Sequence, residues 1–238
     1  MCIRDRDYIV TANEGDSREW GEYLNEDERN FGKGETSPTG KITAENSGLT
    51  GKVVFFDSSD YDGLDSELDY LFGGRSFTVF KADEQGLTEI YTSGNEFEAK
   101  TAGYEPEHFN CSNDNNDIDD RSGKKGVEAE NVTIGNVGEK IYAFIGLERI
   151  GGVMMYDVTN PEKISYANYI NSRDFSADIA GDDSPEGLCF ISESESVDGN
   201  AHLLTACEVS GTVASYELTA RKTEDQGNEQ DSDNGQDS

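Results

Sequence analysis

The sequence has few of the features that mark membrane spans and disulfide scaffolds. In 238 residues there is no run of 18 apolar residues, so we predict no membrane-spanning segment. The four cysteines show no CxxC spacing and are too few for a disulfide framework. No signal peptide is visible, and residues 1–6 have no pattern that continues into the rest of the chain. We therefore expect residues 1–6 to be a segment foreign to the fold.

Basic residues are also scarce. There are 19 Lys and Arg against 50 Asp and Glu, which gives a net charge of −31. This charge repels phosphate backbones and anionic lipid surfaces, so we expect no nucleic-acid partner and no direct membrane insertion. It favours cations and basic partners, although solubility alone is an alternative explanation. No HExxH, GxSxG or Gly-rich phosphate loop identifies a catalytic site.

What the chain does have is internal repetition. The segment 142–159 shares Glu, Gly, Val, Tyr and Thr with the segment 202–219 at identical spacing, and Ile9–Glu14 matches Leu203–Glu208. Upstream, Glu130–Val132 matches Glu186–Leu188. Each copy contains short apolar or β-branched runs between Gly, Asn and Asp, and about four strands per ~40–60 residues is typical of a propeller blade. We predict an all-β fold, a β-propeller, present here as an incomplete C-terminal portion of about three to four blades.

The composition along the chain suggests a simple organisation. We expect a β-propeller portion over residues 7–220, with long loops at 15–50 and 110–126, and a disordered acidic linker over 221–238. A short helical turn is expected near Glu19–Glu28. The strands are predicted at 52–56, 75–80, 87–92, 132–134, 141–147, 153–158, 166–170, 188–192, 202–207 and 212–218.

The repeat also places acidic residues at matching positions. Glu186 precedes the first strand of its copy and Glu208 ends the second, so antiparallel pairing brings both to the same rim. The register that we predict sets Leu188 opposite Glu208 and Cys189 opposite Cys207. The two cysteines could then form a cross-strand disulfide or remain two buried thiols.

If the first strand of each blade is innermost, the acids converge on one mouth of the channel. A ring of like charges is costly unless cations neutralise it, and calcium favours carboxylate oxygens. The candidate calcium ligands are Glu14, Glu130, Glu148, Glu186 and Glu208, with Asp16 and Glu128 as second choices. The candidate ligand-binding cations are Arg149, Arg173 and Arg18. The alternative is that each Glu caps a turn or pairs with a nearby Arg.

Five segments together resemble the choice-of-anchor I family of bacterial surface or secreted proteins, which includes proteins similar to the mesenchyme-specific cell surface glycoprotein. These segments are 8–16, 72–77, 143–149, 151–161 and 184–188. The resemblance implies a propeller-like β domain, export, and a C-terminal linker leading to an anchor. The chain departs from the family pattern at Val127-Glu-Ala-Glu-Asn131, where relatives tend to have Pro-Glu-Pro-Glu-Gly.

Our leading interpretation is a non-enzymatic, monomeric, secreted or cell-surface domain. It would bind calcium, an extracellular ligand or a cell-surface component. The first alternative is a calcium-dependent phosphoesterase, in which the metal would bind phosphate and activate water beside one of the candidate arginines. The second alternative is a purely structural surface domain whose acids serve solvation.

Overall fold

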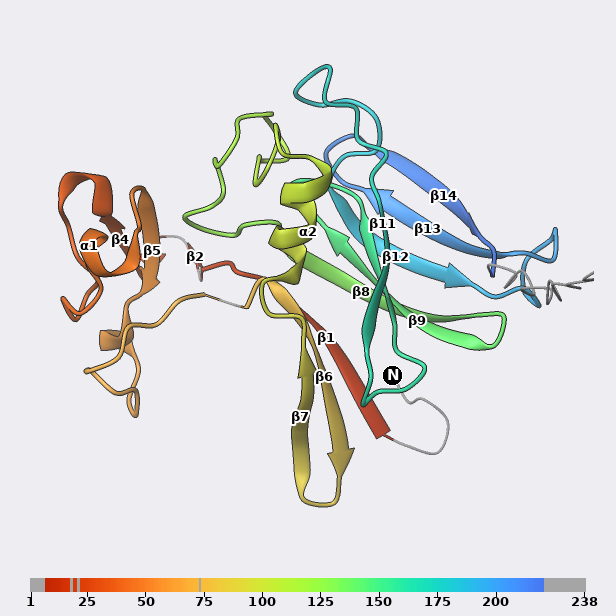
Figure 1. Cartoon of the computed structure of the whole chain (residues 1–238), viewed down its shortest axis with the longest axis horizontal. Coiled ribbons are helices and arrows are strands. Elements are labelled where there is room, and N and C mark those ends of the chain that lie inside the picture. The colour runs from red at the N-terminus through yellow and green to blue at the C-terminus, as the bar shows by residue number, and fades with distance from the viewer. Residues whose placement is uncertain (1–6, 18, 21, 73, 221–238) are drawn as a thin grey trace, which may run out of the picture.

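The computed structural model describes residues 7–17, 19–20, 22–72 and 74–220. The segment 1–6, Arg18 and the expected linker 221–238 lie outside the described residues. All strand pairs in the described part are antiparallel, which confirms the prediction of an all-β fold (Figure 1). These strands form three main sheets and two small ones, and none of the sheets closes on itself.

The first main sheet has the strand order β1-β6-β7. Its strands are β1 (Asp7–Asn13), β6 (Ser76–Asp83) and β7 (Gly86–Thr92). The end of β1 pairs with the start of β6, Asn13 opposite Ser76, although the residues between them form a separate lobe. Side-chain bonds from the Asn13 amide to Ser76 and Thr78 reinforce this junction.

The second and third main sheets are built alike. The second has the order β11-β10-β9-β8 and the third the order β12-β13-β14. Their strands are β8 (Ala129–Val137), β9 (Lys140–Leu147), β10 (Val153–Asp157), β11 (Ser165–Ile170), β12 (Pro185–Ile191), β13 (Ala201–Cys207) and β14 (Thr212–Leu218). In both sheets the first strand is an edge strand and starts with a bulge, at Glu130 and at Glu186.

The observed strand pairing corrects the predicted register of the third sheet. Cys189 pairs with Leu204, and Cys207 pairs with Pro185. The cysteines are therefore not opposite each other; both are free thiols, with Cys189 exposed and Cys207 buried. The prediction was wrong because β12 begins at Pro185, three residues before its predicted start at Leu188, and Pro185 already pairs with the last residue of β13.

Two apolar cores hold the main sheets together. Phe77 and Val79 of the first sheet pack in one core with Ala143, Ile145 and Tyr156 of the second. A second core joins the second and third sheets and contains Phe144, Val153, Ala201 and Leu203. The run Ala143–Leu147 of β9 is buried at every residue, because the second sheet lies between the other two and is covered on both faces.

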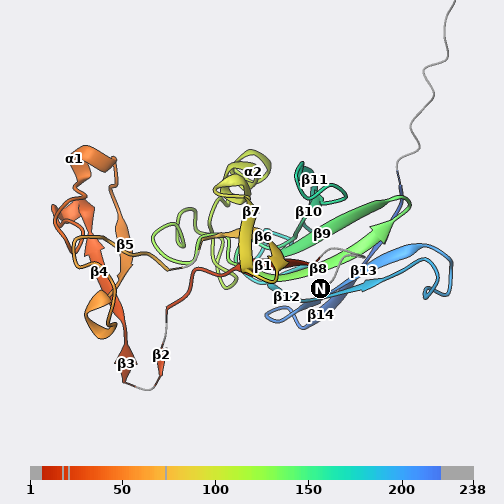
Figure 2. The ribbon, with the colours of Figure 1, turned by 90° about the horizontal axis from the view of Figure 1, so that it is seen from below.

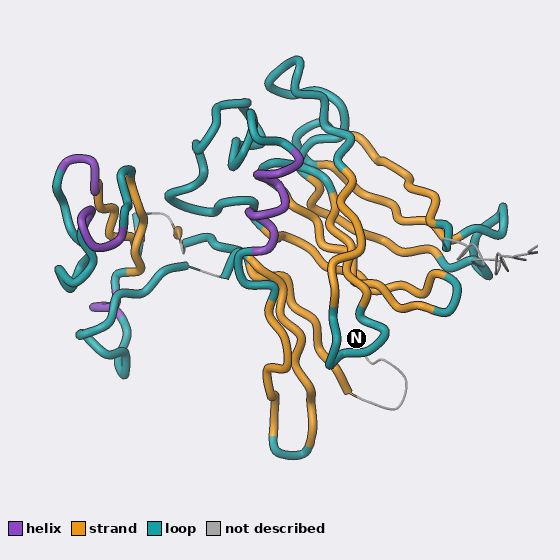
Figure 3. Tube along the Cα trace, in the orientation of Figure 1, coloured by secondary structure: helices purple, strands orange, loops and turns teal. Residues whose placement is uncertain are grey.

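The longer α-helix of the described residues was not expected from the sequence. Helix α2 (Glu96–Tyr104) lies against the main sheets (Figure 3). Phe97 stacks on Phe77, with ring centroids 6.1 Å apart, and Glu96 accepts a hydrogen bond from the Tyr156 hydroxyl at 3.0 Å. Acidic residues in its first turn, Glu96 and Glu98, interact favourably with the helix dipole. None of the helices in the described ranges is long and apolar enough to cross a membrane.

The residues between β1 and β6 form a lobe that Figures 1 and 2 show to one side of the three main sheets. It contains β2 (Glu19–Trp20), β3 (Tyr23–Leu24), β4 (Glu26–Asn30), β5 (Lys52–Phe56), helix α1 (Ala44–Ser47) and two 3₁₀ turns, η1 (Phe31–Lys33) and η2 (Ser58–Asp60). The helical turn expected near Glu19–Glu28 was wrong, because this segment pairs as strands. Strand β5 has its predicted bounds.

Candidate acidic metal site

Three glutamates from two sheets meet at one point. Glu14 directly follows β1, Glu128 directly precedes β8, and Glu130 is the bulge residue of β8. One carboxylate oxygen of each lies within 4.8 Å of those of the other two. The predicted convergence of acids from different repeats is therefore present for Glu14 and Glu130, and Glu128 lies with them.

Glu128 is the buried member of this cluster, with no exposed side-chain surface. Its carboxylate accepts a hydrogen bond from Lys125 Nζ at 2.8 Å and another from Arg149 Nε. Burial opposes ionisation, but these two cations outweigh it and lower the pKa of Glu128. The backbone of Glu128 is left-handed, with a φ of 54°, and Ser184 before β12 has a φ of 64°. Both first strands thus begin from the same uncommon turn.

The other two members carry raised pKa values. Partial burial, followed by the charges of Glu130 and Glu128, raises the pKa of Glu14 to about 7. Burial, followed by the charges of Glu128 and Glu186, also raises the pKa of Glu130. The Glu14 carboxyl is therefore only partly ionised near neutral pH.

Asp16 is anchored beside this cluster rather than inside it. Its carboxylate lies 2.8 Å from Lys125 Nζ and 3.8 Å from Lys124 Nζ. Although burial opposes ionisation, the hydrogen bond from Lys125 and the other local donors lower the pKa of Asp16. Sequence reasoning missed Lys125, which bridges Asp16 and Glu128; the only signal was the Lys-Lys pair in a chain with few cations.

Glu148 lies next to Glu128 and outside the three-glutamate cluster. Its backbone amide donates to the Glu128 carbonyl at 2.8 Å, so Glu148 is opposite Glu128 rather than Glu130. Its carboxylate accepts hydrogen bonds from the Asn113 amide at 2.7 Å and the Ser184 hydroxyl at 3.3 Å, and it lies 3.4 Å from Arg149. Burial, followed by the charge of Glu128, raises the pKa of Glu148 to about 8.

The raised pKa of Glu148 predicts a specific pH dependence of stability. The folded protein keeps a proton on Glu148 at pH values well above the ordinary pKa of 4.5. The stability that this proton binding gives to the folded state is complete below pH 4.5 and is lost as the pH rises to about 8. Glu148→Gln should therefore match the wild type near pH 5 and be more stable than it at pH 8.5. Urea unfolding at both pH values measures this, and a variant equally destabilised at both would contradict it.

Glu186 and Glu208 do not join the three-glutamate cluster. Together with Glu130 they line a shallow hollow of about 560 Å³ at the same end of the second and third sheets. The amide of Glu208 donates to the Ser184 carbonyl at 2.8 Å, which mirrors the bond from Glu148 to Glu128. Glu130 thus borders both the cluster and the hollow.

The candidate arginines have separate positions. Arg149 reaches the cluster through Glu128, and its Nη1 donates to Asn113 at 2.6 Å. Arg173 has no exposed side-chain surface. Its Nη1 and Nη2 donate to the carbonyls of Ser112, Arg149, Asn115 and Asp178 and to the Asn116 side chain, and Nη1 lies 3.4 Å from Asp183. Arg173 therefore binds the surrounding loops and does not contact the acidic cluster.

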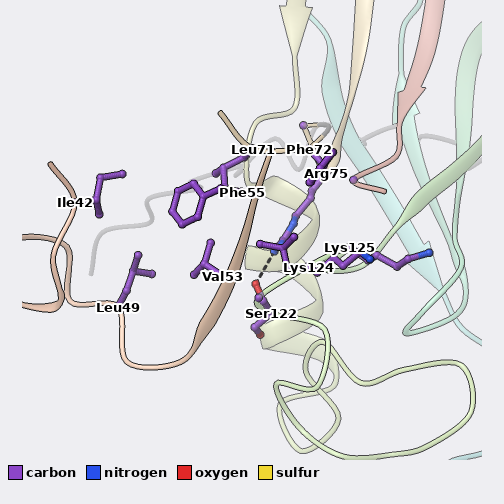
Figure 4. A pocket seen from close by; sticks show the side chains of 14 residues that line it. Ile42, Leu49, Val53, Phe55, Leu71, Phe72, Arg75, Ser122, Lys124 and Lys125 are labelled. Atoms are coloured by element: carbon purple, nitrogen blue, oxygen red, sulfur yellow. Dashed lines mark hydrogen bonds between the residues drawn. The ribbon is translucent and has the colours of Figure 1, made fainter. Parts of the chain in front are cut away.

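A second cavity, of about 350 Å³, lies between the lobe and the loop 122–125 that leads to β8 (Figure 4). One wall is apolar and includes Phe55 and Leu71, and the other carries Arg75, Lys124 and Lys125. Arg75 is held by Glu98 at 3.1 Å and by the Ser122 carbonyl at 3.0 Å. Because Lys125 also binds Asp16 and Glu128, this cavity and the acidic cluster share one cation.

The fold and this edge define a class of protein: an all-β domain of stacked antiparallel sheets with carboxylates gathered where the sheets meet. The chain belongs to the choice-of-anchor I family, because the model of the choice-of-anchor I domain matches residues 1–161. This confirms the resemblance seen in the sequence. Membership implies a secreted or surface protein.

The chain is also similar to one curated protein, Gigasin-3a of Magallana gigas. The two are 34% identical over 100 residues, which cover 40% of this chain and 34% of that protein. The match therefore spans about a third of the relative's length. No solved structure matches the chain.

Proposed function

We propose that the chain is part of a secreted or cell-surface β-propeller that binds calcium at the junction of its sheets, without catalysis. The observation that supports the cation site is the meeting of Glu14, Glu128 and Glu130, whose carboxylate oxygens lie within 4.8 Å of one another. Calcium takes six to eight oxygen ligands, and the three carboxylates of this cluster would meet part of that need. The hollow lined by Glu130, Glu186 and Glu208 leaves room for water or an extracellular ligand beside the ion.

The propeller interpretation is supported by how the sheets meet. The strands that begin the second and third sheets, β8 and β12, contact each other, and β1 contacts β8. First strands placed toward a common centre are the arrangement found in propeller blades. The acidic residues lie at the ends of these central strands, where a mouth of the channel would be.

The phosphoesterase alternative finds less support. It needs a cation free to hold phosphate beside the carboxylates. Arg149 is bonded to Glu128 and Asn113, and Lys125 is bonded to Asp16 and Glu128. Binding without catalysis is therefore the function that the geometry supports best.

Calcium should stabilise the folded protein. At about 100 times its dissociation constant, a ligand adds ~2.7 kcal/mol to the free energy of unfolding, so we expect the melting temperature to rise by several degrees between EDTA and millimolar calcium. Glu14→Gln with Glu130→Gln should abolish the rise, while the exposed Glu139→Gln should keep it. Because Glu14 has a pKa of about 7, calorimetry near pH 6.5 should also show proton release on binding. An unchanged melting temperature in the wild type would refute the calcium site.

A further inference from the structure

The three main sheets stack in series through equivalent faces. The first sheet packs on the second with the face that carries Phe77, whose ring centroid lies 4.7 Å from that of Tyr156. The second packs on the third with the face that carries Phe144 and Val153, against Leu203. Each sheet therefore presents one face to the next sheet and receives the previous sheet on the other.

The third sheet has the same outward-facing positions, but they are open. The pairs Ala12–Phe77, Gly146–Val153 and Ala206–Val213 are equivalent in the three sheets. Phe77 is 0% exposed and Val153 is 2% exposed, whereas Val213 is 70% exposed. The described residues cover the first two faces and leave the third in solvent.

We call this surface the open face of the third sheet. Strand pairing aligns three rows across it, and these are Gly187, Ala206 and Val213; Cys189, Leu204 and Ser215; and Ile191, His202 and Glu217. The first two rows are uncharged and mostly apolar. The opposite face of the same sheet carries Ala201 and Leu203, both buried against the second sheet. The two faces of the third sheet therefore differ in whether another sheet covers them, and not in whether their side chains are apolar.

We propose that the open face docks a further antiparallel β-sheet of the same pattern, contributed by a segment outside residues 7–220. The surface continues an interface that this chain forms twice, in the same direction and with equivalent residues. Heterologous contacts of this kind repeat until a ring closes. The proposal does not depend on calcium and extends the proposed function to an interaction surface.

The open face also restricts its occupant. At Gly135 of the second sheet an added Cβ would lie 2.3 Å from the Phe190 ring, so glycine makes room for that ring. The equivalent position in the third sheet is Ile191, which pairs with His202 as Gly135 pairs with Tyr142. The docking sheet should therefore carry a side chain smaller than Phe at the position of Phe190, as β8 does with Ile134.

An extended chain tests the proposal. A second copy of residues 127–171, which contains β8 to β11 and no cysteine, is joined after Ser238 so that residues 221–238 connect it to the open face. With Cys2 replaced by Ser, the exposed Cys189 reports cover through its reaction rate with a thiol reagent. We expect the rate to fall about tenfold or more in the extended chain. Val213→Lys should restore it, whereas Val197→Lys, on the exposed β12–β13 loop, should not.

A second extended chain with Ile191→Gly gives the docking sheet more room and guards against a steric misfit. Unchanged Cys189 rates in both extended chains would overturn the proposal. Sedimentation of the unextended chain is expected to show a monomer. A dimer that Val213→Lys dissociates would assign the open face to a second copy of this chain and would also overturn the proposal.

Discussion

Replacing Arg173 with Met should cost about 3–5 kcal/mol of unfolding free energy. Removing one partner of a buried ion pair leaves the other charge uncompensated, which is the costly case. Here Asp183 has no exposed side-chain surface and lies 3.4 Å from Arg173. Burial already raises the pKa of Asp183 to about 6 despite the nearby guanidinium. Without Arg173 the pKa of Asp183 should rise further, so the variant should lose most stability above pH 7.

The control for this prediction is Arg29→Met. Arg29 pairs with Asp27 at the surface and is 34% exposed, so its loss should cost no more than about 1 kcal/mol. Urea unfolding followed by circular dichroism measures both variants. Adding Asp183→Asn to Arg173→Met should recover part of the loss, because the unpaired charge is then removed. A loss in Arg173→Met no larger than in Arg29→Met would show that the loops do not depend on this side chain.

Replacing Glu128 with Gln should also lower the free energy of unfolding by about 3–5 kcal/mol. Here the charge removed is negative, and the charges left unpaired are positive. The substitution leaves Lys125 and Arg149, which are 16% and 14% exposed, without the carboxylate that both contact. It should also lower the pKa of Glu14 below its present value of about 7, because Glu128 helps to raise that pKa.

Glu67→Gln is the matched control, since Glu67 pairs with Lys41 at the surface and is 77% exposed. Urea unfolding gives the stability of each variant, and an NMR titration of the Glu14 carboxyl gives its pKa. A stable Glu128→Gln variant with an unchanged Glu14 pKa would mean that the cluster is not electrostatically linked.

Much of this structure follows from patterns in the sequence. Alternating apolar residues and the recurring Glu-Gly-Val-Tyr spacing place the strands of the second and third sheets within a few residues. The bulges at Glu130 and Glu186 were not predicted, because they lie at the starts of their strands, before the apolar runs 132–134 and 188–192 that marked those strands in the sequence. Helix α2 was missed because its nine residues bury only Phe97 and Thr101, too few for a clear helical period.

The candidate site shows the same division. Matching glutamates in three repeats predicted that Glu14 and Glu130 would approach each other, and they do. The central place of Glu128 was not expected, because it depends on a left-handed turn and on Lys125 and Arg149. Arg173 was a candidate ligand-binding residue in the sequence, but it is surrounded by carbonyls of its own loops. Its role depends on contacts far apart along the chain, which no local pattern encodes.

The position of the lobe has a consequence for how the chain folds. β13 and β14 are joined by a tight turn, whereas the equivalent strands β1 and β6 enclose the whole lobe, from Glu14 to Arg75. The entropy of closing a loop grows with the logarithm of its length, so bringing β1 to β6 costs roughly 2.4 kcal/mol more than the short hairpin. The first sheet is therefore the slowest of the three to nucleate by itself. A second sheet that is already formed offers β1 and β6 an apolar surface on which to meet.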